Sequence, residues 1–346
     1  DLTEAVAILR GRPPRPPAAP ADAPAEAGAG DRRLEDLRGQ VHARWAAIVA
    51  AAGRHPLLLQ GPPGTGKSML ARRVADLLPP LEPDRAMELA RIEALVGPLA
   101  GLPSRPPLRA PHCSCSVQAL LGGGHPLRPG ELSRAHGGVL FLDELPEFPR
   151  PALEGLRQPL EERCVRLLRA REEAVFPADA LLVAARNPCP CGFLGHPRIP
   201  CRCTTAALGR YAQRVSGPLL DRFDLFVEMG PVPAAELDGP PTPPGRAEAD
   251  AALERARAVQ AERSRRGSFA EAGRAELDPI LAEGIEPAAR RLLQRAGEEL
   301  RLSGRGHLRC LRVARTLADL DGGGPVALHH LRRALTYRRP PPVPVA

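Results

Sequence analysis

The sequence has few aromatic residues, a single lysine and no long apolar run. Aromatic residues make up 3% of the chain and Trp45 is the only tryptophan, so an extended platform for stacking bases is not expected. No run of about 18 apolar residues occurs, which argues against a membrane-spanning helix. The first ten residues, DLTEAVAILR, lack the charged start and apolar stretch of a signal peptide. We therefore expect a folded, soluble, cytoplasmic protein with no membrane partner.

The positive charge of the chain comes from arginine. Lys67 is the only lysine among 48 basic residues, and the formal net charge is +8. An arginine-rich surface attracts polyanions such as nucleic acid, but it can also be merely solvated, and the excess of arginine, alanine and proline fits a general substitution bias. Charge alone is therefore weak support for a nucleic-acid partner.

Two proline-rich segments divide the chain. A short amphipathic helix is predicted over residues 1–10 and a linker over 11–30, and residues 231–249 form a second linker. Between the linkers, helical stretches, the first from Asp31 to near Gly53, alternate with short apolar runs, which predicts an α/β core over 31–230 with a parallel sheet. The expected buried strands are Leu57–Leu59, Val139–Leu142, Leu181–Ala184 and Leu225–Val227. Helical periodicity then predicts a C-terminal helical lid domain over 250–337, followed by a tail at 338–346.

A glycine-rich loop follows the first predicted strand and opens a helix. Its sequence, GPPGTGKS, lets successive backbone N–H groups point at phosphate oxygens at the positive end of the helix dipole. Lys67 is expected to reach the β and γ phosphates, and the Ser68 hydroxyl to bind Mg²⁺. The alternative is a plain turn, but the only lysine stands where a compact ammonium is needed. The predicted nucleotide-binding residues are Gly61, Pro62, Pro63, Gly64, Thr65, Gly66, Lys67, Ser68 and Met69.

Two acidic residues follow the second predicted strand, in GGVLFLDELPEF. Ligands bind at the carboxyl ends of strands in open α/β sheets, so Asp143 is expected to hold Mg²⁺ with Ser68 and Glu144 to polarise the attacking water. Alone, the pair could also cap a surface turn. Together with the phosphate loop it predicts ATP hydrolysis.

Asn187 and Arg222 are weaker candidates. Asn187 ends the third predicted strand, where its amide could hydrogen-bond the γ-phosphate and the lytic water, although Asn before Pro is also common in turns. Arg222 precedes the last predicted strand, but any given arginine of this chain is more often a solvated surface residue. The role of Arg222 depends on the sequence around it.

Taken together, these segments resemble the ComM/YifB family, magnesium-chelatase-subunit-like AAA+ ATPases of bacteria. The resemblance covers residues 31–337. The segments that carry it are GPPGTGKSMLARRVADLLPPL, GELSRAHGGVLFLDELPEF, VAARNPCPCG, RYAQRVSGPLLDRFDLFVE and LRVARTLADLDG. The resemblance implies a hexameric ring around DNA that drives branch migration in natural transformation.

The resemblance also implies roles for three residues. Asn187 matches sensor 1, Arg222 matches the arginine finger that reaches a neighbouring subunit's ATP, and Arg305 matches sensor 2. The nucleotide is expected between the core and the helical lid. The family has a Lon-protease-like domain before the ATPase, whose last helix resembles DLTEAVAILRG, so we expect this chain to be a fragment.

Four of the eight cysteines follow Asn187 closely. Cys189, Cys191, Cys201 and Cys203 form two CxC pairs, and four thiolates could bind Zn²⁺ tetrahedrally. Reduced buried thiols and redox-active pairs remain alternatives. Cys113 and Cys115 are further candidates for the same neighbourhood.

A glycine-rich segment at residues 120–138 is the candidate DNA contact. It carries His125, Arg128, Arg134 and His136, and in a ring it is expected to face the pore and contact phosphates without reading sequence. A plain surface loop is the alternative.

Three functions remain open from the sequence. The first is an ATP-driven motor on branched or single-stranded DNA, and the second is a magnesium-chelatase-type ATPase that remodels a partner protein. A nucleotide-dependent scaffold without turnover is disfavoured because Asp143 and Glu144 are both present.

Overall fold

The computed structural model describes residues 34–99, 101–169, 172–265 and 284–338. The helix and linker predicted over 1–30, and the tail beyond 338, lie outside these ranges. Within the described residues, no helix combines the length and apolar character that a bilayer crossing requires.

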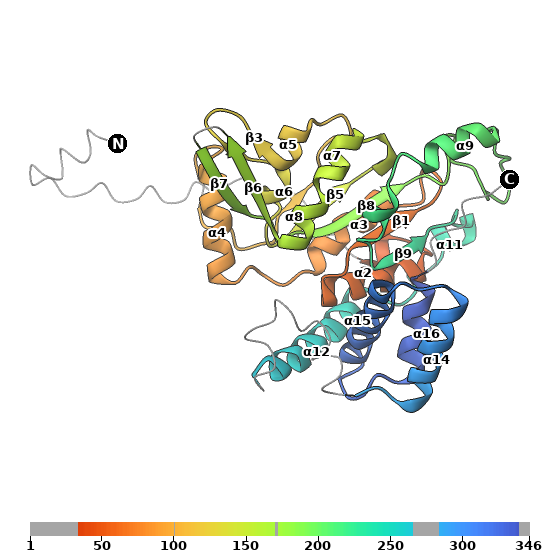
Figure 1. Ribbon diagram of the computed structural model, residues 1–346. Helices are drawn as coiled ribbons and strands as arrows, with labels where there is room; N and C mark the ends of the chain where they lie inside the picture. The colour runs from red at the N-terminus through yellow and green to blue at the C-terminus, as the bar shows by residue number, and fades with distance from the viewer. Residues whose placement is uncertain (1–33, 100, 170–171, 266–283, 339–346) are drawn as a thin grey trace, which may run out of the picture.

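A five-stranded parallel sheet forms the core, in the order β2-β5-β8-β1-β9 (Figure 1). Four of its strands coincide with the predicted buried strands, which confirms that prediction. The fifth, β2, is a two-residue edge strand that the sequence pattern did not predict. The strands are β1 (Leu57–Gln60), β2 (Leu108–Arg109), β5 (Val139–Leu142), β8 (Leu181–Arg186) and β9 (Leu225–Glu228).

Side-chain alternation along these strands builds two apolar layers. Leu57 and Leu59 of β1 pack into the layer shared with α2 (Val41–Gly53) and α3 (Lys67–Leu77), whereas Leu58 packs into the layer on the other face. That second layer includes α5 (Val117–Leu121), α6 (Glu131–Arg134), α7 (Arg150–Gly155) and α10 (Gly217–Leu220). Helices cover both faces, as a buried parallel sheet requires.

Two small hairpins extend the core beyond its sheet. One joins β3 (Gly122–Gly123) to β4 (Arg128–Pro129), and the other joins β6 (Cys164–Arg169) to β7 (Glu172–Pro177). The remaining helices of the core are η1 (Leu34–Asp36), α4 (Pro83–Ala94), η2 (Leu145–Glu147), α8 (Arg157–Glu162), α9 (Thr205–Ala212) and α11 (Ala234–Asp238).

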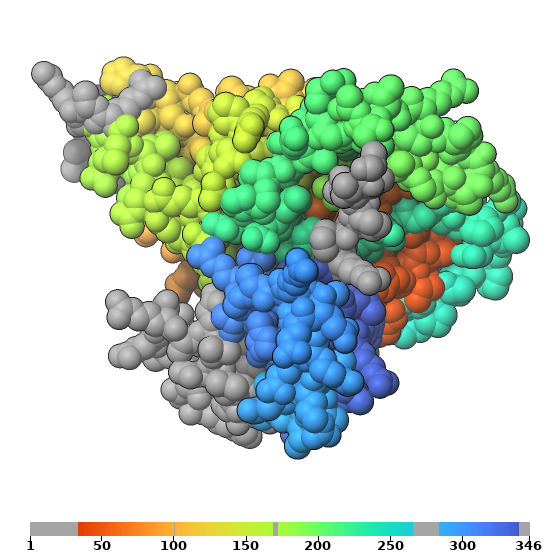
Figure 2. Space-filling view, turned by 45° about the vertical axis from the view of Figure 1, so that its right-hand side comes forward, coloured from red at the N-terminus to blue at the C-terminus, as the bar shows by residue number. Residues whose placement is uncertain are grey.

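The C-terminal region is helical, as predicted, and packs on α2. It contains α12 (Arg246–Arg265), α14 (Pro287–Glu299), α15 (Gly304–Leu320) and α16 (Leu328–Thr336). The Arg333 guanidinium lies 4.4 Å from the centre of the Trp45 ring, and the backbone N–H of Phe226 donates to the carbonyl of Tyr337 at 2.8 Å. In Figure 2 the blue C-terminal residues lie directly beside the red-orange segment that holds α2 and β1.

Two boundaries differ from the sequence-based expectation. The predicted helix from Asp31 to Gly53 is broken, because Gly39 and Gln40 both adopt the left-handed conformation and α2 begins only at Val41. The predicted linker 231–249 contains α11 and the first residues of α12. Helix α12 begins at Arg246, whose backbone N–H donates to Glu35 at 2.8 Å. Because these two residues are far apart in the sequence, the composition of the segment does not reveal this contact.

Candidate functional site

The predicted phosphate loop joins β1 to α3 at the carboxyl edge of the sheet. Gly64 and Gly66 have positive φ angles of 80° and 90°, which turn the chain before the first residue of α3. A Cβ on Gly61 would lie 2.2 Å from the carbonyl oxygen of Met229, so only glycine fits there. These glycines let the backbone N–H groups at the start of α3 gather at the positive end of the helix.

Lys67 is the first residue of α3, and its side chain folds back over the loop. The ammonium donates to the carbonyls of Gly61 at 2.7 Å and Pro62 at 2.8 Å, and to Asn187 Oδ1 at 3.2 Å. Burial lowers the pKa of Lys67, and the carboxylates of Asp143 and Glu144 oppose that shift. A buried ammonium that already lies among carbonyl and amide oxygens is well placed to meet phosphate oxygens.

Ser68 and Asp143 meet at the head of α3. The Ser68 hydroxyl donates to Asp143 Oδ2 at 2.6 Å, although 75 positions separate the two residues. A hydroxyl and a carboxylate are hard oxygen donors of the kind that Mg²⁺ takes alongside substrate phosphates. The two residues therefore fit the ion that a bound nucleoside triphosphate brings.

Glu144 follows directly and is exposed beside this pair. Its backbone N–H donates to Asp143 Oδ1 at 2.9 Å, and its φ of 53° is left-handed, which is unusual for a side chain this long. This turn separates the two neighbouring carboxylates, so that Asp143 faces Ser68 while Glu144 stays open to solvent. Cys113 Sγ lies 4.0 Å from Glu144 Oε2.

Asn187 joins the same group from the carboxyl end of β8. Its side chain accepts from Lys67, and its carbonyl accepts from the Tyr211 hydroxyl at 3.2 Å. Tyr211, on α9, was not predicted, because a single tyrosine 24 positions from its partner gives no sequence signal. Met69 is 42% exposed on the first turn of α3.

Arg222 and Arg305 lie elsewhere, at the amino edge of the sheet. Both reach one carboxylate oxygen, Glu161 Oε1, at 2.8 Å for Arg222 and 3.5 Å for Arg305. Lys67 follows the carboxyl end of β1, whereas Arg222 precedes β9 and shares its cavity with residues that precede β1. Within one chain, Arg305 therefore lies at the other edge of the sheet from Lys67, whereas the sequence predicted the nucleotide between the core and the helical lid.

The cavity around these two residues is strongly basic. It has a volume of about 840 Å³ and lies between the amino ends of β1, β8 and β9 and helix α15. Its arginines are Arg54, Arg85, Arg163, Arg222, Arg263, Arg305, Arg309, Arg312 and Arg315. The acids that line it are Glu161, Asp179, Asp224 and Asp319. This excess of arginine favours an anionic occupant.

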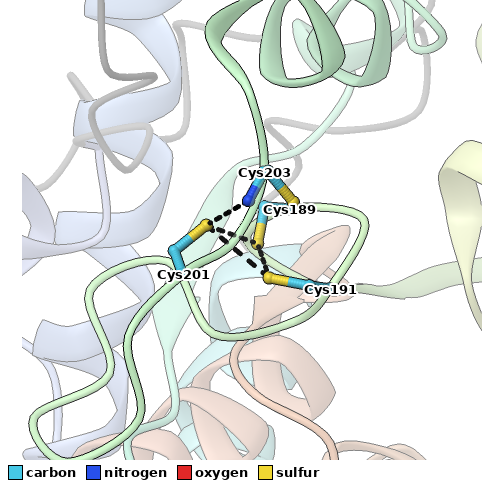
Figure 3. A group of neighbouring side chains, drawn as sticks. All are labelled: Cys189, Cys191, Cys201 and Cys203. Carbon is cyan, nitrogen blue, oxygen red and sulfur yellow. Dashed lines mark hydrogen bonds between the residues drawn. The ribbon is translucent and has the colours of Figure 1, made fainter.

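The four cysteines that follow Asn187 converge, as Figure 3 shows. Their sulfur atoms all lie within 4.8 Å of one another. Burial tends to raise the pKa of Cys191, but hydrogen bonds from the backbone of Arg202 and Phe193 and from Cys189 lower it to about 6. Cys113 and Cys115 do not belong to this group. The cluster has the ligand set and the compactness of a thiolate metal site.

The candidate DNA segment, residues 120–138, has residues that are held within the fold and residues that are exposed. Arg134 is held by Glu93 and Glu131, each at 3.0 Å, and His136 is buried against Glu88 at 2.9 Å. Those two residues stabilise the fold and do not face solvent freely. By contrast, His125 has a side chain that is 81% exposed, and Arg128 is exposed on the β3–β4 hairpin.

Comparison with known proteins finds one family and several relatives that are similar to this chain. A family model described as magnesium chelatase, subunit ChlI, matches residues 33–237, and its C-terminal counterpart matches residues 246–338. An uncharacterized protein of Mycobacterium tuberculosis is 44% identical over 318 residues, covering 88% of this chain and 61% of that protein. The competence protein ComM of Haemophilus influenzae is 42% identical over 313 residues, covering 88% and 60%.

The protein YifB of Escherichia coli is 41% identical over 311 residues, again covering 88% of this chain and 60% of that protein. The chain thus spans about 60% of the length of the curated relatives it matches.

Proposed function

Because the chain belongs to the magnesium chelatase subunit ChlI family of AAA+ ATPases, we propose that it is a ring-forming motor that hydrolyses ATP to move DNA. The observation that carries the ATPase part is the meeting of Lys67, Ser68, Asp143 and Asn187 at one edge of the sheet. Three separate segments supply these side chains, and the contacts link residues up to 120 positions apart. Such a convergence is what phosphoryl transfer requires.

Each residue has a distinct part in the proposed reaction. The phosphate loop and Lys67 hold the triphosphate, and Ser68 and Asp143 hold Mg²⁺, which neutralises phosphate charge when it is bound. Glu144 accepts a hydrogen bond from the attacking water and orients it, and Asn187 supports the γ-phosphate. Glu144 suits this role because its carboxylate is exposed at the site and is not tied to Ser68.

A ring is proposed because the two arginines do not serve the phosphate loop of their own chain. Arg222 and Arg305 line a basic cavity at the opposite edge of the sheet. A head-to-tail contact would bring the amino edge of one subunit against the carboxyl edge of the next. The two arginines would then leave Glu161 and pair with the terminal phosphates of the neighbour's nucleotide.

DNA is the proposed polymer because of the resemblance to the ComM/YifB proteins and because of the β3–β4 hairpin. Arg128 and His125 are exposed on this hairpin. Arginine contacts to phosphate do not depend on base sequence, so we expect binding to branched or single-stranded DNA without sequence preference.

A chelatase-type ATPase that remodels a partner protein is the second candidate, and the matched family description favours it. Both candidates use the same ATP-binding residues, so only the activating partner separates them. DNA stimulates the first kind of motor. A porphyrin-pathway partner subunit stimulates the second.

The test is the ATP hydrolysis rate with and without forked or four-way DNA. We expect DNA to raise the rate several-fold in the wild type and in an Arg291→Ala control, which removes an exposed arginine of α14. Arg128→Ala should lose most of this stimulation but keep the rate measured without DNA. Stimulation by a porphyrin-pathway partner and not by DNA would favour the second candidate, and full stimulation of Arg128→Ala would contradict the hairpin contact.

A further inference from the structure

We propose that the four cysteines bind one structural Zn²⁺ ion and that this ion fixes the loop between β8 and α9 against the phosphate loop. The metal would thereby position Asn187 for hydrolysis. The part of this inference that concerns hydrolysis rests on the ATPase function proposed above. The metal site itself does not.

The sulfur positions fit a single ion. Cys189 Sγ lies 3.3 Å from Cys191 Sγ and 3.7 Å from Cys201 Sγ, and the distance between the Cys191 and Cys201 sulfurs is 3.6 Å. Zinc bound to four thiolates at about 2.3 Å places the sulfurs about 3.8 Å apart at the corners of a tetrahedron. The observed group needs only small adjustments to reach that geometry, and soft thiolate ligands select zinc over Mg²⁺.

Local turns and a contact between Phe193 and His196 shape the loop that carries these cysteines, but regular secondary structure does not hold it. Residues 187–204 contain no helix or strand, and the segment that follows β8 projects from the core, green in Figure 2. One cysteine pair lies near each end of the loop. A loop of this length without regular structure is uncommon unless it has a function, and a metal shared by its two ends closes it at low entropic cost.

The residues on both sides of the first cysteine pair, Cys189 and Cys191, contact the ATP-binding residues. Asn187, two positions before Cys189, accepts the Lys67 ammonium at 3.2 Å. Gly192, directly after Cys191, lies so close to the phosphate loop that a Cβ there would be 2.7 Å from Pro63 Cδ. These contacts place the proposed ion directly behind one wall of the nucleotide site.

The same arrangement ties the far end of the loop to Asn187. Tyr211 lies on α9, the helix that follows Cys203, and its hydroxyl donates to the Asn187 carbonyl at 3.2 Å. Loss of the metal would separate the two cysteine pairs and leave Asn187 less firmly positioned. Because Lys67 and Ser68 belong to the phosphate loop itself, we expect nucleotide binding to persist while hydrolysis, which needs Asn187 in place, declines.

The test compares wild type, a Cys201→Ser/Cys203→Ser variant and a Cys164→Ser control. Cys164 lies on β6, outside the cluster, and the double variant leaves the residues next to Asn187 intact. Metal analysis should find one zinc per chain in the wild type and the control, and none in the double variant. The hydrolysis rate of the double variant should fall at least about tenfold, with affinity for a fluorescent ATP analogue changed less than about threefold.

Limited trypsin digestion gives a readout that does not depend on activity. Arg198 and Arg202 lie within the loop, and cleavage after them should be much faster in the double variant than in the wild type or the control. Should the double variant fail to fold, the same measurements apply to wild type whose zinc has been displaced by a mercurial and captured by a chelator.

Several results would overturn the inference. Wild type that contains no zinc, or that contains iron instead, would refute the metal assignment. A zinc-free variant that hydrolyses ATP at the wild-type rate would refute the link to Asn187. Wild type that binds zinc but hydrolyses no ATP would refute the ATPase function, while zinc-dependent protection of Arg198 and Arg202 would still support the metal site.

Discussion

At the scale of single residues, Lys67 is the most constrained cation of the ATP-binding site. Its ammonium fits between two carbonyl oxygens of its own loop and the amide of Asn187, with 8% of the residue exposed. A guanidinium is planar and larger, and it cannot donate to all three oxygens from the same space. This tight fit explains why position 67 holds a lysine, although the other Lys or Arg positions of the chain are all arginine.

We therefore predict that Lys67→Arg, although it keeps the charge, lowers kcat/KM for ATP by about 100-fold or more. The measurement is steady-state phosphate release. The control is Arg72→Lys, which makes the reverse exchange at an exposed position of the same helix and should leave the rate within about twofold. Near-normal turnover of Lys67→Arg would contradict the tight fit.

Residue-scale prediction from the sequence worked where motifs are contiguous. The loop that contains Lys67 could be aligned with Asp143 and Asn187, which directly follow two strands, because parallel strands all end at one edge of the sheet. Glu161, which holds both Arg222 and Arg305, could not be predicted. One acid among the 40 of this chain has no distinguishing spacing.

At the scale of elements, the sequence predicted the strands that contain an apolar run of three or more residues. Strands β1, β5, β8 and β9 are four or more residues long, and their apolar residues are buried. Strands β2, β3 and β4 have two residues each, too few for any periodicity. The β6–β7 hairpin leaves Leu168 74% exposed and Val175 48% exposed, so its alternation does not mark a buried face.

A buried polar group connects the helical region to the core. His55, just before β1, bridges Asp224 at 2.9 Å and Thr316 of α15 at 2.8 Å. Burial alone would raise the pKa of Asp224, but the hydrogen bond and charge of His55, with the charges of Arg312 and Arg309, hold it below its ordinary value. The carboxylate therefore stabilises the junction between β9 and α15.

The sign of the pH dependence follows from this lowered pKa. The contribution of Asp224 to stability is fully present above the pKa of an unfolded aspartate, about 3.9, and is lost as the pH falls through the lower folded value. At pH 7, Asp224→Asn should reduce the free energy of unfolding by about 3 to 5 kcal/mol, because it leaves His55 and Arg309 without their buried partner.

Thermal and denaturant unfolding between pH 3 and pH 8 checks this prediction. Asp221→Asn, at an exposed neighbouring position, is the matched control and should change stability by less than about 0.5 kcal/mol. Equal stability of the Asp224→Asn variant and the wild type at pH 7 would show that the junction does not depend on this carboxylate.

At the scale of the whole molecule, the ATP-binding residues and the basic cavity lie at opposite edges of one sheet. Lys67 follows the carboxyl end of β1, and Arg222 precedes β9, which runs parallel to it. In the proposed ring, a second copy of the chain would bring its basic cavity against these ATP-binding residues. The sequence could not show this separation, because it depends on the path of the chain around the sheet.

Subunit mixing tests the ring directly. We predict that Lys67→Ala and Arg222→Ala are each inactive alone, and that an equal mixture recovers activity at about a quarter of its interfaces, where an intact phosphate loop meets an intact arginine. Wild type mixed with either variant controls for subunit exchange. If exchange occurs and the mixture stays inactive, or if Arg222→Ala alone is active, Arg222 does not act on a neighbour.

The most direct measurement of the central claim is ATP hydrolysis and ATP binding by Glu144→Gln beside the wild type. The substituted amide would keep the size of the side chain and one hydrogen-bond acceptor oxygen, but it could not accept a proton from water. We predict that the variant binds ATP and Mg²⁺ as tightly as the wild type while phosphate release falls at least about 100-fold. Hydrolysis by Glu144→Gln at the wild-type rate would contradict the assignment of this site.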